Sequence, residues 1–352
     1  MPALYLHIGH NKTGSTFIQT VFSNNRSRLA KLKISYPKCG ADLRDIDLDR
    51  MTPTGNGSSL FSSKSTFNDI VTSSCHSDTN RLLFSSEVLF DQFSVCPDLV
   101  FVKNWSEQCG IDRVYILLFI RDPIDHALSF WQQRVKGWQC ETRPIDEYIK
   151  LSYDFPIQVA DVVQKIEHAG LKYNIFHYRE QKTNIIKPFK RLLHIPDHFE
   201  FTIPKDIPVN RSLTAGEVEL QRSINKHTQK SGRIFAFYMS NKFSDAPKHR
   251  MTPSRSAQEN ALMRLRPAIQ FVNARMSLSQ GYHEDIIYEQ PPQDVHFTVE
   301  QIQLIGERIG RALVADDRVS FRRRATVTGR WSRLAARVRR RLGNIRKRVR
   351  AC

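Results

Sequence analysis

Residues 3–20 read Ala-Leu-Tyr-Leu-His-Ile-Gly-His-Asn-Lys-Thr-Gly-Ser-Thr-Phe-Ile-Gln-Thr. The apolar run 4–8 predicts a buried strand, and residues 15–31 have the apolar spacing of a helix. The turn between them carries a glycine on each side, a lysine and several hydroxyl side chains. Backbone N–H groups at a helix N-terminus attract anions, as does the helix dipole, so this turn predicts an anion-binding site. The alternative is an ordinary strand-to-helix turn, which is also rich in Gly, Ser and Thr.

The turn does not have the Walker A pattern of nucleoside triphosphatases. That pattern places a glycine directly before its lysine, whereas here Asn11 precedes Lys12 and a glycine follows it. The sequence therefore favours a phosphate-type ligand over ordinary nucleotide hydrolysis. The candidate anion-binding residues are Lys12, Thr13, Gly14, Ser15 and Thr16.

Strands and helices alternate along the first 200 residues. Apolar runs predict further strands at 33–36, 81–86, 114–120 and 173–178, with helices that include 157–169 and 183–193. Run 114–120 is apolar throughout, which is typical of a central parallel strand buried on both faces. We therefore predict an α/β fold with a central parallel sheet flanked by helices.

Two further regions have a recognisable character. Residues 52–79 are rich in Ser, Thr, Asn and Gly, which predicts a long surface loop with a short helix around 67–71. This loop is either a lid over a binding site or an insertion. After residue 200 the chain is predicted to be helical over 214–228, 257–276 and 298–314. Capping boxes begin the first and last of these helices, Thr214 with Glu217 and Thr298 with Gln301.

A carboxylate follows the predicted strand 81–86 directly. Ligands of open α/β sheets lie at the C-terminal ends of the strands, so Glu87 would lie near Lys12 if the two strands are neighbours. Glu87 could then act as a general base. The alternative is a glutamate that simply favours the N-terminal end of the next helix.

An arginine follows the predicted strand 114–120. Ser129 lies eight residues after Arg121, on the helix that begins at Pro123. An arginine fork at a strand end and a serine on the next helix can hold one phosphate from two sides. The alternative for Arg121 is a salt bridge to Asp122 or Asp125.

The composition, 40% hydrophobic and 25% charged residues in 352, is that of a soluble globular protein. The six cysteines show no CxxC pair and no zinc-type spacing with histidines, so we expect reduced thiols in a cytoplasmic protein. No run is apolar and long enough to span a bilayer, and we expect no signal peptide.

The positive charge is concentrated at one end. Residues 321–352 hold 13 Lys or Arg and no Asp or Glu, which leaves 40 basic against 35 acidic residues in 1–320. Apolar side chains recur there every three or four residues, which predicts a basic amphipathic helix. They are Trp331, Leu334, Val338, Leu342, Ile345 and Val349. Such a helix is typical of docking on an anionic membrane surface or an acidic partner, and the alternative is a solvated tail. We expect a peripheral position at the inner face of the membrane.

Three segments together resemble the PAPS-dependent sulfotransferases, in particular the bacterial carbohydrate type. Residues 7–16 look like the loop that holds the 5′-phosphosulfate of 3′-phosphoadenosine-5′-phosphosulfate (PAPS). Arg121 and Ser129 match the pair that binds the 3′-phosphate, and residues 83–87 are similar to the strand that ends near the catalytic base. The resemblance covers about residues 3–200 and implies a three-layer, P-loop-like fold. The glycine-rich C-terminal nucleotide loop of the cytosolic small-molecule sulfotransferases is not found, so contacts to adenine and ribose stay unassigned.

The resemblance implies transfer of a sulfuryl group from PAPS, the co-substrate, to a hydroxyl or amine of an acceptor, a glycan or lipid-linked sugar, with no metal required. Lys12 would neutralise charge on the leaving phosphate oxygen, and Glu87 would take the acceptor's proton. His10 and His76 are the alternative bases. The expected domains are a sulfotransferase domain over 1–320, with a nucleotide-binding core at about 3–200 and a helical part at about 209–320, and the basic tail 321–352.

Two other functions stay open from the sequence. A P-loop nucleotide kinase is the second enzyme hypothesis, although the missing glycine before Lys12 counts against it. The third hypothesis is a protein that binds polyanions through the tail 321–352, with nucleic acid the less favoured partner. Magnesium-dependent turnover of ATP would favour the kinase, and a steeply salt-dependent affinity would reveal polyanion binding.

Overall fold

A computed structural model describes most of the chain in two compact units, Met1–Gln293 and Asp294–Cys352. The described residues are 2–38, 55–75, 78–137, 139–203, 212–228, 251–276, 281–287, 297–307, 309 and 311. The predicted helix of the tail 321–352 lies outside them. Among the helices that are described, none is both long and apolar enough to cross a membrane.

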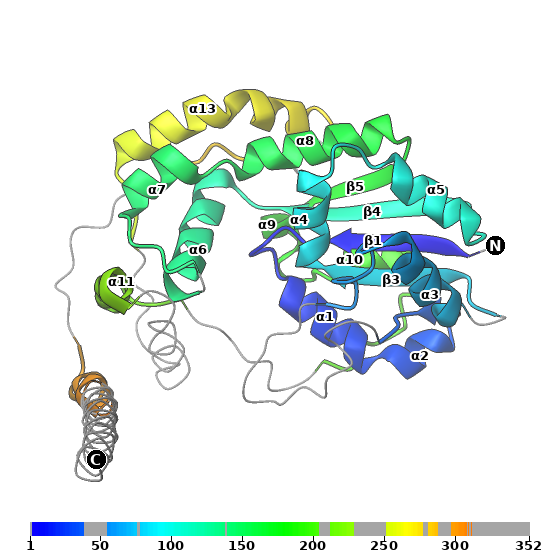
Figure 1. The fold of residues 1–352 in the computed structure, drawn as a ribbon, viewed down its shortest axis with the longest axis horizontal. Coiled ribbons are helices and arrows are strands. Elements are labelled where there is room, and N and C mark those ends of the chain that lie inside the picture. Colours follow the sequence, from blue (N-terminus) through cyan, green and yellow to red (C-terminus); the bar gives the residue numbers. More distant parts are fainter. Residues whose placement is uncertain are drawn as a thin grey trace, which may run out of the picture. The chain divides into compact units, whose positions relative to one another are not determined.

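The first unit is built on a five-stranded sheet in which every neighbouring pair is parallel (Figure 1). The strand order is β2-β3-β1-β4-β5. The strands are β1 (Ala3–Ile8), β2 (Ile34–Ser35), β3 (Arg81–Ser86), β4 (Arg113–Ile120) and β5 (Lys172–His177). The predicted α/β class and parallel sheet are confirmed, with β1 in the centre and buried along its whole length.

Helices cover both faces of the sheet. On one face, α1 and α10 pack on β1, β3 and β4 in a cluster that includes Phe22, Phe119 and Phe189. On the other face lie α4, α5 and α8, and α13 packs on α7 and α8. The helices are α1 (Ser15–Asn24), α2 (Arg26–Ala30), α3 (Lys64–Ser74), α4 (Glu87–Val95), α5 (Val100–Gln108), α6 (Pro123–Lys136), α7 (Ile145–Ser152), α8 (Phe155–His168), α9 (Tyr178–Gln181), α10 (Lys187–Leu192), α11 (Ala215–Thr228) and α13 (Arg255–Asn273).

Some predicted helix bounds were wrong. The expected helix 15–31 is two helices, because Asn25 turns its side chain onto the backbone carbonyls of Val21 and Thr202 and ends α1. The expected helix 183–193 is the shorter α10, and the single turn α9 before it was not predicted. Within the expected loop 52–79, α3 is longer than the short helix predicted there. α5 and α7 were not predicted at all.

The two predicted capping boxes are confirmed. The N–H of Thr214 donates to Glu217 Oε2 at 2.9 Å, and the N–H of Glu217 donates to Thr214 Oγ1 at 3.3 Å. In the second unit, Thr298 and Gln301 make the same reciprocal pair at 2.9 and 3.2 Å.

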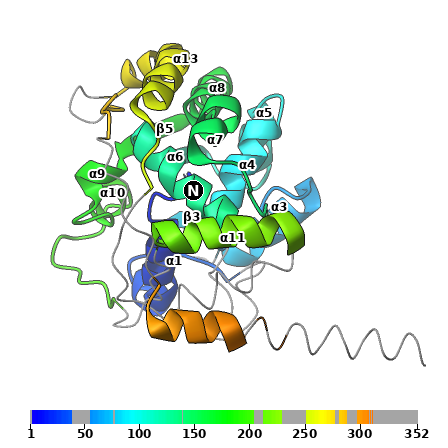
Figure 2. The same cartoon turned by 90° about the vertical axis from the view of Figure 1, so that its left-hand side faces the viewer.

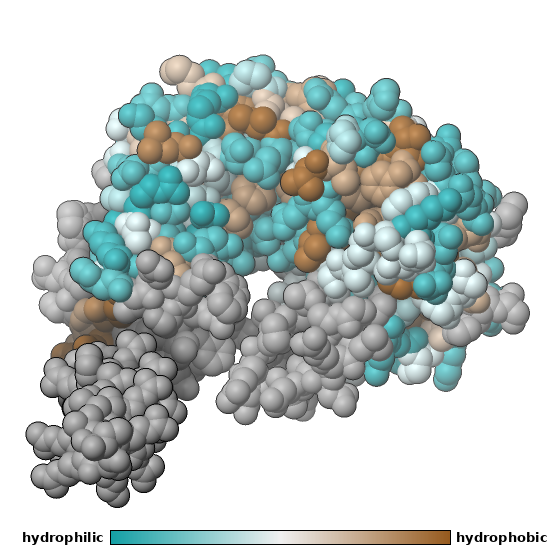
Figure 3. Space-filling view, in the orientation of Figure 1, coloured by the Kyte–Doolittle hydropathy of each residue, from teal (hydrophilic) through white to brown (hydrophobic). Residues whose placement is uncertain are grey.

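The strands all end at one edge of the sheet, which Figure 2 views end-on. α6, α7 and α11 lie on this side of the sheet. In the space-filling view the apolar side chains lie between larger polar areas of the described surface (Figure 3). Ligands of parallel α/β sheets bind where the strands end, so a functional site is expected at this edge.

The end of β3 is completed by a side chain that belongs to no strand. β2 pairs only with Arg81 and Leu82, the first two residues of β3. Beyond that point Asn56 takes over, because its Nδ2 donates to the Leu83 carbonyl at 3.1 Å and its Oδ1 accepts from the Ser85 N–H at 2.8 Å. The side-chain amide thus stands in for the peptide group of a neighbouring strand.

Gly55 lets Asn56 come this close. Its φ is +80°, and an added Cβ would lie 1.9 Å from the Ser85 carbonyl oxygen. Gly110 has nearly the same φ, +75°, but a Cβ there would meet nothing within 4 Å. Replacing Gly110 by alanine would therefore cost only the strained backbone conformation, whereas replacing Gly55 would add a steric clash to the same strain.

We predict that Gly55→Ala destabilises the protein by about 2 kcal/mol more than Gly110→Ala, which should cost only about 1–2 kcal/mol. The physical reason is that Ala at 110 pays for the left-handed backbone alone, whereas Ala at 55 must also displace the end of β3. Urea denaturation at 25 °C measures both changes. Equal losses for the two variants would contradict this account of the sheet edge.

Candidate functional site

Three predicted site residues come from the ends of three adjacent strands. β1 lies between β3 and β4, and the Gly9 N–H donates to the Ser86 carbonyl at 3.1 Å. Lys12 follows β1, Glu87 follows β3 and Arg121 follows β4. The predicted proximity of Glu87 to the Lys12 turn is therefore observed.

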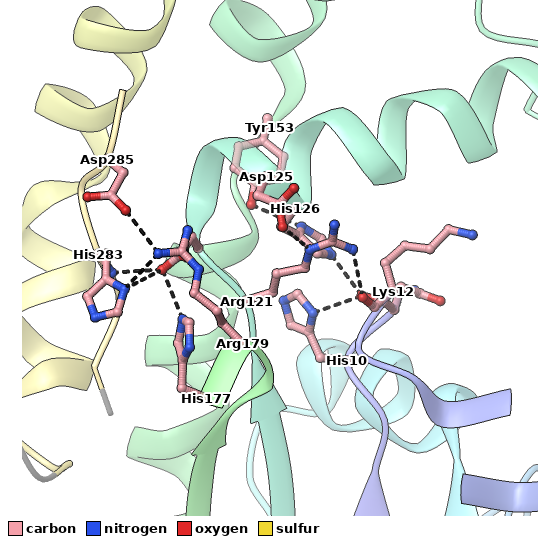
Figure 4. Close-up of polar contacts among 12 residues, drawn as sticks. His10, Lys12, Arg121, Asp125, His126, Tyr153, His177, Arg179, His283 and Asp285 are labelled. Atoms are coloured by element: carbon pink, nitrogen blue, oxygen red, sulfur yellow. Dashed lines mark hydrogen bonds and ion pairs between the residues drawn. The ribbon is translucent and has the colours of Figure 1, made fainter. Parts of the chain in front are cut away.

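The turn itself is held by its carbonyl groups (Figure 4). The His10 carbonyl accepts from Thr13 Oγ1 at 2.5 Å. The Asn11 carbonyl accepts from His10 Nδ1 at 3.0 Å and from His126 Nε2 at 2.9 Å. The Lys12 carbonyl accepts from Arg121 Nη1 at 3.0 Å. Three successive carbonyls thus point into the protein.

The opposite side of the turn presents donors. Lys12 has φ +64° and Gly14 has φ +85°, both in the left-handed region, and such a conformation turns successive N–H groups toward one side. α1 has no side-chain cap, and its first backbone bond runs from the Ile18 N–H to the Gly14 carbonyl. The N–H groups of residues 15–17 consequently have no acceptor within the helix. This arrangement suits an anion.

Ser15 adds a further polar group. Its side chain is 2% exposed, and its hydroxyl has no hydrogen-bond partner of good geometry among the described residues. A Cβ on Gly9 would lie 2.6 Å from Ser15 Oγ and 3.2 Å from Glu87 Cγ. Glycine at residue 9 therefore avoids a clash with both of these side chains. Thr16, also predicted to bind, is half-buried at the start of α1.

Lys12 and Glu87 influence each other electrostatically. Burial lowers the pKa of the Lys12 ammonium, and the Glu87 carboxylate opposes that change. Burial raises the pKa of Glu87 from 4.5 to about 6, while Lys12 and the nearby Ser15 hydroxyl pull it down. A carboxylate with a pKa near neutrality is suited to general-base work. Glu87 is also the first residue of α4, so the helix-terminus alternative describes its position equally well.

Arg121 is engaged on two sides. Its Nε donates to Asp125 Oδ2 at 2.5 Å, and its Nη1 holds the Lys12 carbonyl. The salt bridge to Asp125, which the sequence left as the alternative, is therefore present. Ser129 lies one turn further along α6 and is half-buried. Among the described contacts, none joins Ser129 to Arg121.

A pocket of about 420 Å³ lies beside Arg121. Its lining residues are Arg121, Asp122, Asp125, Tyr178, Arg179, Lys182 and Ile287. Sequence reasoning missed Arg179 and Lys182. The signal that could have found them is their place directly after β5, at the same edge of the sheet.

Asp122 forms a buried polar cluster at the wall of this pocket. Its Oδ1 accepts from His177 Nε2 and from the His283 N–H, both at 2.9 Å, and its Oδ2 pairs with Arg179 at 2.7 Å. Burial alone would raise the pKa of Asp122, but these hydrogen bonds and the Arg179 charge bring it below its ordinary value. One atom each of Asp122, His177 and His283 lie within 4.8 Å of one another, the spacing of a metal site. The guanidinium on Asp122 and the bonds already made to it fit an ion-paired carboxylate better than a metal ligand.

Of the two histidines proposed as alternative bases, His10 lies among the described residues. His10 is 1% exposed and lies among Phe90, Phe155 and His126. Burial lowers the pKa of His10 to about 4, and its Nδ1 donates to the Asn11 carbonyl. His10 is thus placed to shape the turn. His76 lies outside the described residues.

Comparisons of this chain with models of protein families, with curated proteins and with solved structures give no match.

We predict that Glu87→Gln stabilises the protein at pH 7.5 by about 1–2 kcal/mol. Because the pKa of Glu87 is higher in the folded protein than its ordinary 4.5, the wild type loses stability as the pH rises from about 4.5 through 6. The amide carries no charge and avoids that loss, so the difference should shrink toward zero at pH 4. Urea denaturation at both pH values tests this. The exposed Glu107 on α5 provides the control Glu107→Gln, which should show no such gain. A variant that is less stable than wild type at pH 7.5 would contradict the assignment.

Proposed function

We propose that this protein is a PAPS-dependent sulfotransferase that moves a sulfuryl group to a hydroxyl or amine of a glycan or glycolipid acceptor. The observation that supports the proposal most is the convergence of Lys12, Glu87 and Arg121 on one donor-rich turn from three adjacent parallel strands. A cation, a carboxylate with a pKa near neutrality and an arginine at an anion cradle are what such a transfer needs.

In this proposal, PAPS binds across both the Lys12 turn and the pocket beside Arg121. The 5′-phosphosulfate lies against the N–H groups at the start of α1, where Ser15 offers a hydroxyl and Gly9 leaves room. The 3′-phosphate lies toward Arg121, and Arg179 and Lys182 add positive charge to the same pocket. A second phosphate away from the reacting centre distinguishes PAPS from ATP.

The transfer is an in-line displacement at sulfur. The acceptor oxygen or nitrogen forms a bond to sulfur while the bond from sulfur to the 5′-phosphate oxygen breaks, and the electron pair stays with the phosphate. Lys12 meets the charge that develops on that leaving oxygen. Glu87 takes the proton of the acceptor, for which its pKa of about 6 is suitable. His10 is the weaker candidate for the base, because burial lowers its pKa to about 4.

We predict that the wild-type protein binds adenosine 3′,5′-bisphosphate in calorimetry and transfers radiolabel from PAPS to acceptor extracts. Lys12→Ala should reduce transfer by about 10²–10³-fold, because the charge on the leaving group loses its main partner. Lys103→Ala, at an exposed position on α5, serves as the control and should transfer normally.

The same experiment distinguishes the rival enzymes. If the wild-type protein does not bind adenosine 3′,5′-bisphosphate but turns over ATP with magnesium, the kinase hypothesis is supported and the proposal is wrong. Mass spectrometry of acceptor fractions incubated with PAPS should show the gain of one sulfuryl group, which identifies the acceptor directly.

A further inference from the structure

His126 is a buried side chain that neither the sequence patterns nor the proposed chemistry uses. It lies on α6 and is completely buried. Its ring lies 4.1 Å from the ring of His10 between centroids, and Phe130 and Phe155 enclose it. Both of its ring nitrogens make hydrogen bonds, to Asn11 and to Tyr153.

The proton on this ring can be placed from its partners. The Asn11 carbonyl can only accept, so His126 Nε2 carries a hydrogen and donates it at 2.9 Å. Burial, with the nearby charges of Arg121 and Lys12 and with His10, holds the pKa of His126 well below 6.5, so the ring is neutral. Nδ1 is then an acceptor, and the Tyr153 hydroxyl donates to it at 3.0 Å. The direction of donation runs from Tyr153 through His126 to the Asn11 carbonyl.

That carbonyl belongs to the peptide that leads into Lys12. The left-handed backbone of Lys12, φ +64°, is costly for a residue with a side chain and persists only where its surroundings enforce it. The surroundings here are the hydrogen bonds to the carbonyls of residues 10, 11 and 12. Among these, the bond from His126 links the peptide of Asn11 to α6.

We propose that His126, oriented by Tyr153, is a positioning residue that holds the Lys12 turn in its anion-binding conformation. This inference rests on the proposed function for the identity of the ligand. Loss of the Nε2 donor leaves the Asn11 carbonyl with only the bond from its chain neighbour His10, which moves with the turn. The Asn11 peptide can then rotate, which turns the neighbouring N–H groups and the Lys12 side chain away from a 5′-phosphate. The pocket at Arg121, Arg179 and Lys182 keeps its own ion pairs, Arg121 with Asp125 and Arg179 with Asp122, which do not involve His126.

The test compares two nucleotides by calorimetry. Adenosine 3′,5′-bisphosphate reaches both the turn and the pocket, whereas adenosine 3′-monophosphate has no phosphate for the turn. The ratio of their affinities therefore reports on the turn alone. His126→Leu should lower this ratio about tenfold and leave the affinity for the monophosphate unchanged. His126→Gln, whose amide nitrogen can still donate to the Asn11 carbonyl, should restore the ratio to within about twofold of wild type.

A matched control separates positioning from loss of stability. Asn225 on α11 is also buried and donates to two backbone carbonyls, those of Val135 and Glu141. Asn225→Ala should lower the thermal stability but keep the affinity ratio of the wild type. An unchanged ratio in His126→Leu, or an equal loss of affinity for both nucleotides, would overturn the role of His126. A wild-type protein that binds neither nucleotide would instead overturn the proposed function.

Discussion

The site depends on the pairing of β1 between β3 and β4. Parallel strands all end at one edge, so residues that follow different strands lie close together. Glu87 is more than 70 positions from Lys12 along the chain, and Arg121 is more than 100 positions from it. The register Ile8 opposite Ser86 places Glu87 beside the turn that carries Lys12. The pairing of β1 with β3 and β4 therefore determines which charged side chains lie close together.

Burial gives these charges their chemical character. Glu87 and Lys12 are close enough for each to support the charged form of the other, yet burial acts against both. The site thus holds a carboxylate and an ammonium that are less stable as ions than they would be in water. In the proposed transfer, an anion bound beside Lys12 and a proton taken up by Glu87 would relieve that situation, so the site would hold the means for a reaction at the expense of stability.

The sequence predicted the strands and the residues at their ends. Continuous apolar runs such as 114–120 mark buried strands, and the rule for strand ends then points to Glu87 and Arg121. It could not predict contacts that form only in three dimensions. His126 resembles any polar residue of a helix until α6 lies against the turn, and Asn56 is one of many small polar residues in a loop-like segment. α5 and α7 were missed because they are only 9 and 8 residues long, so the helical period of their apolar residues repeats only about twice.

The side-chain amide of Asn56 has a consequence for how this fold can vary. Because Asn56 alone satisfies the Leu83 carbonyl and the Ser85 N–H, the last part of β3 needs no neighbouring strand on that side. The register of β3, and with it the position of Glu87, is held by the pairing with β1 and by this one side chain. In the proposed transferase, the position of the general base would therefore be set without a further strand beside the end of β3, which would leave that side of the site open to acceptors of different shape.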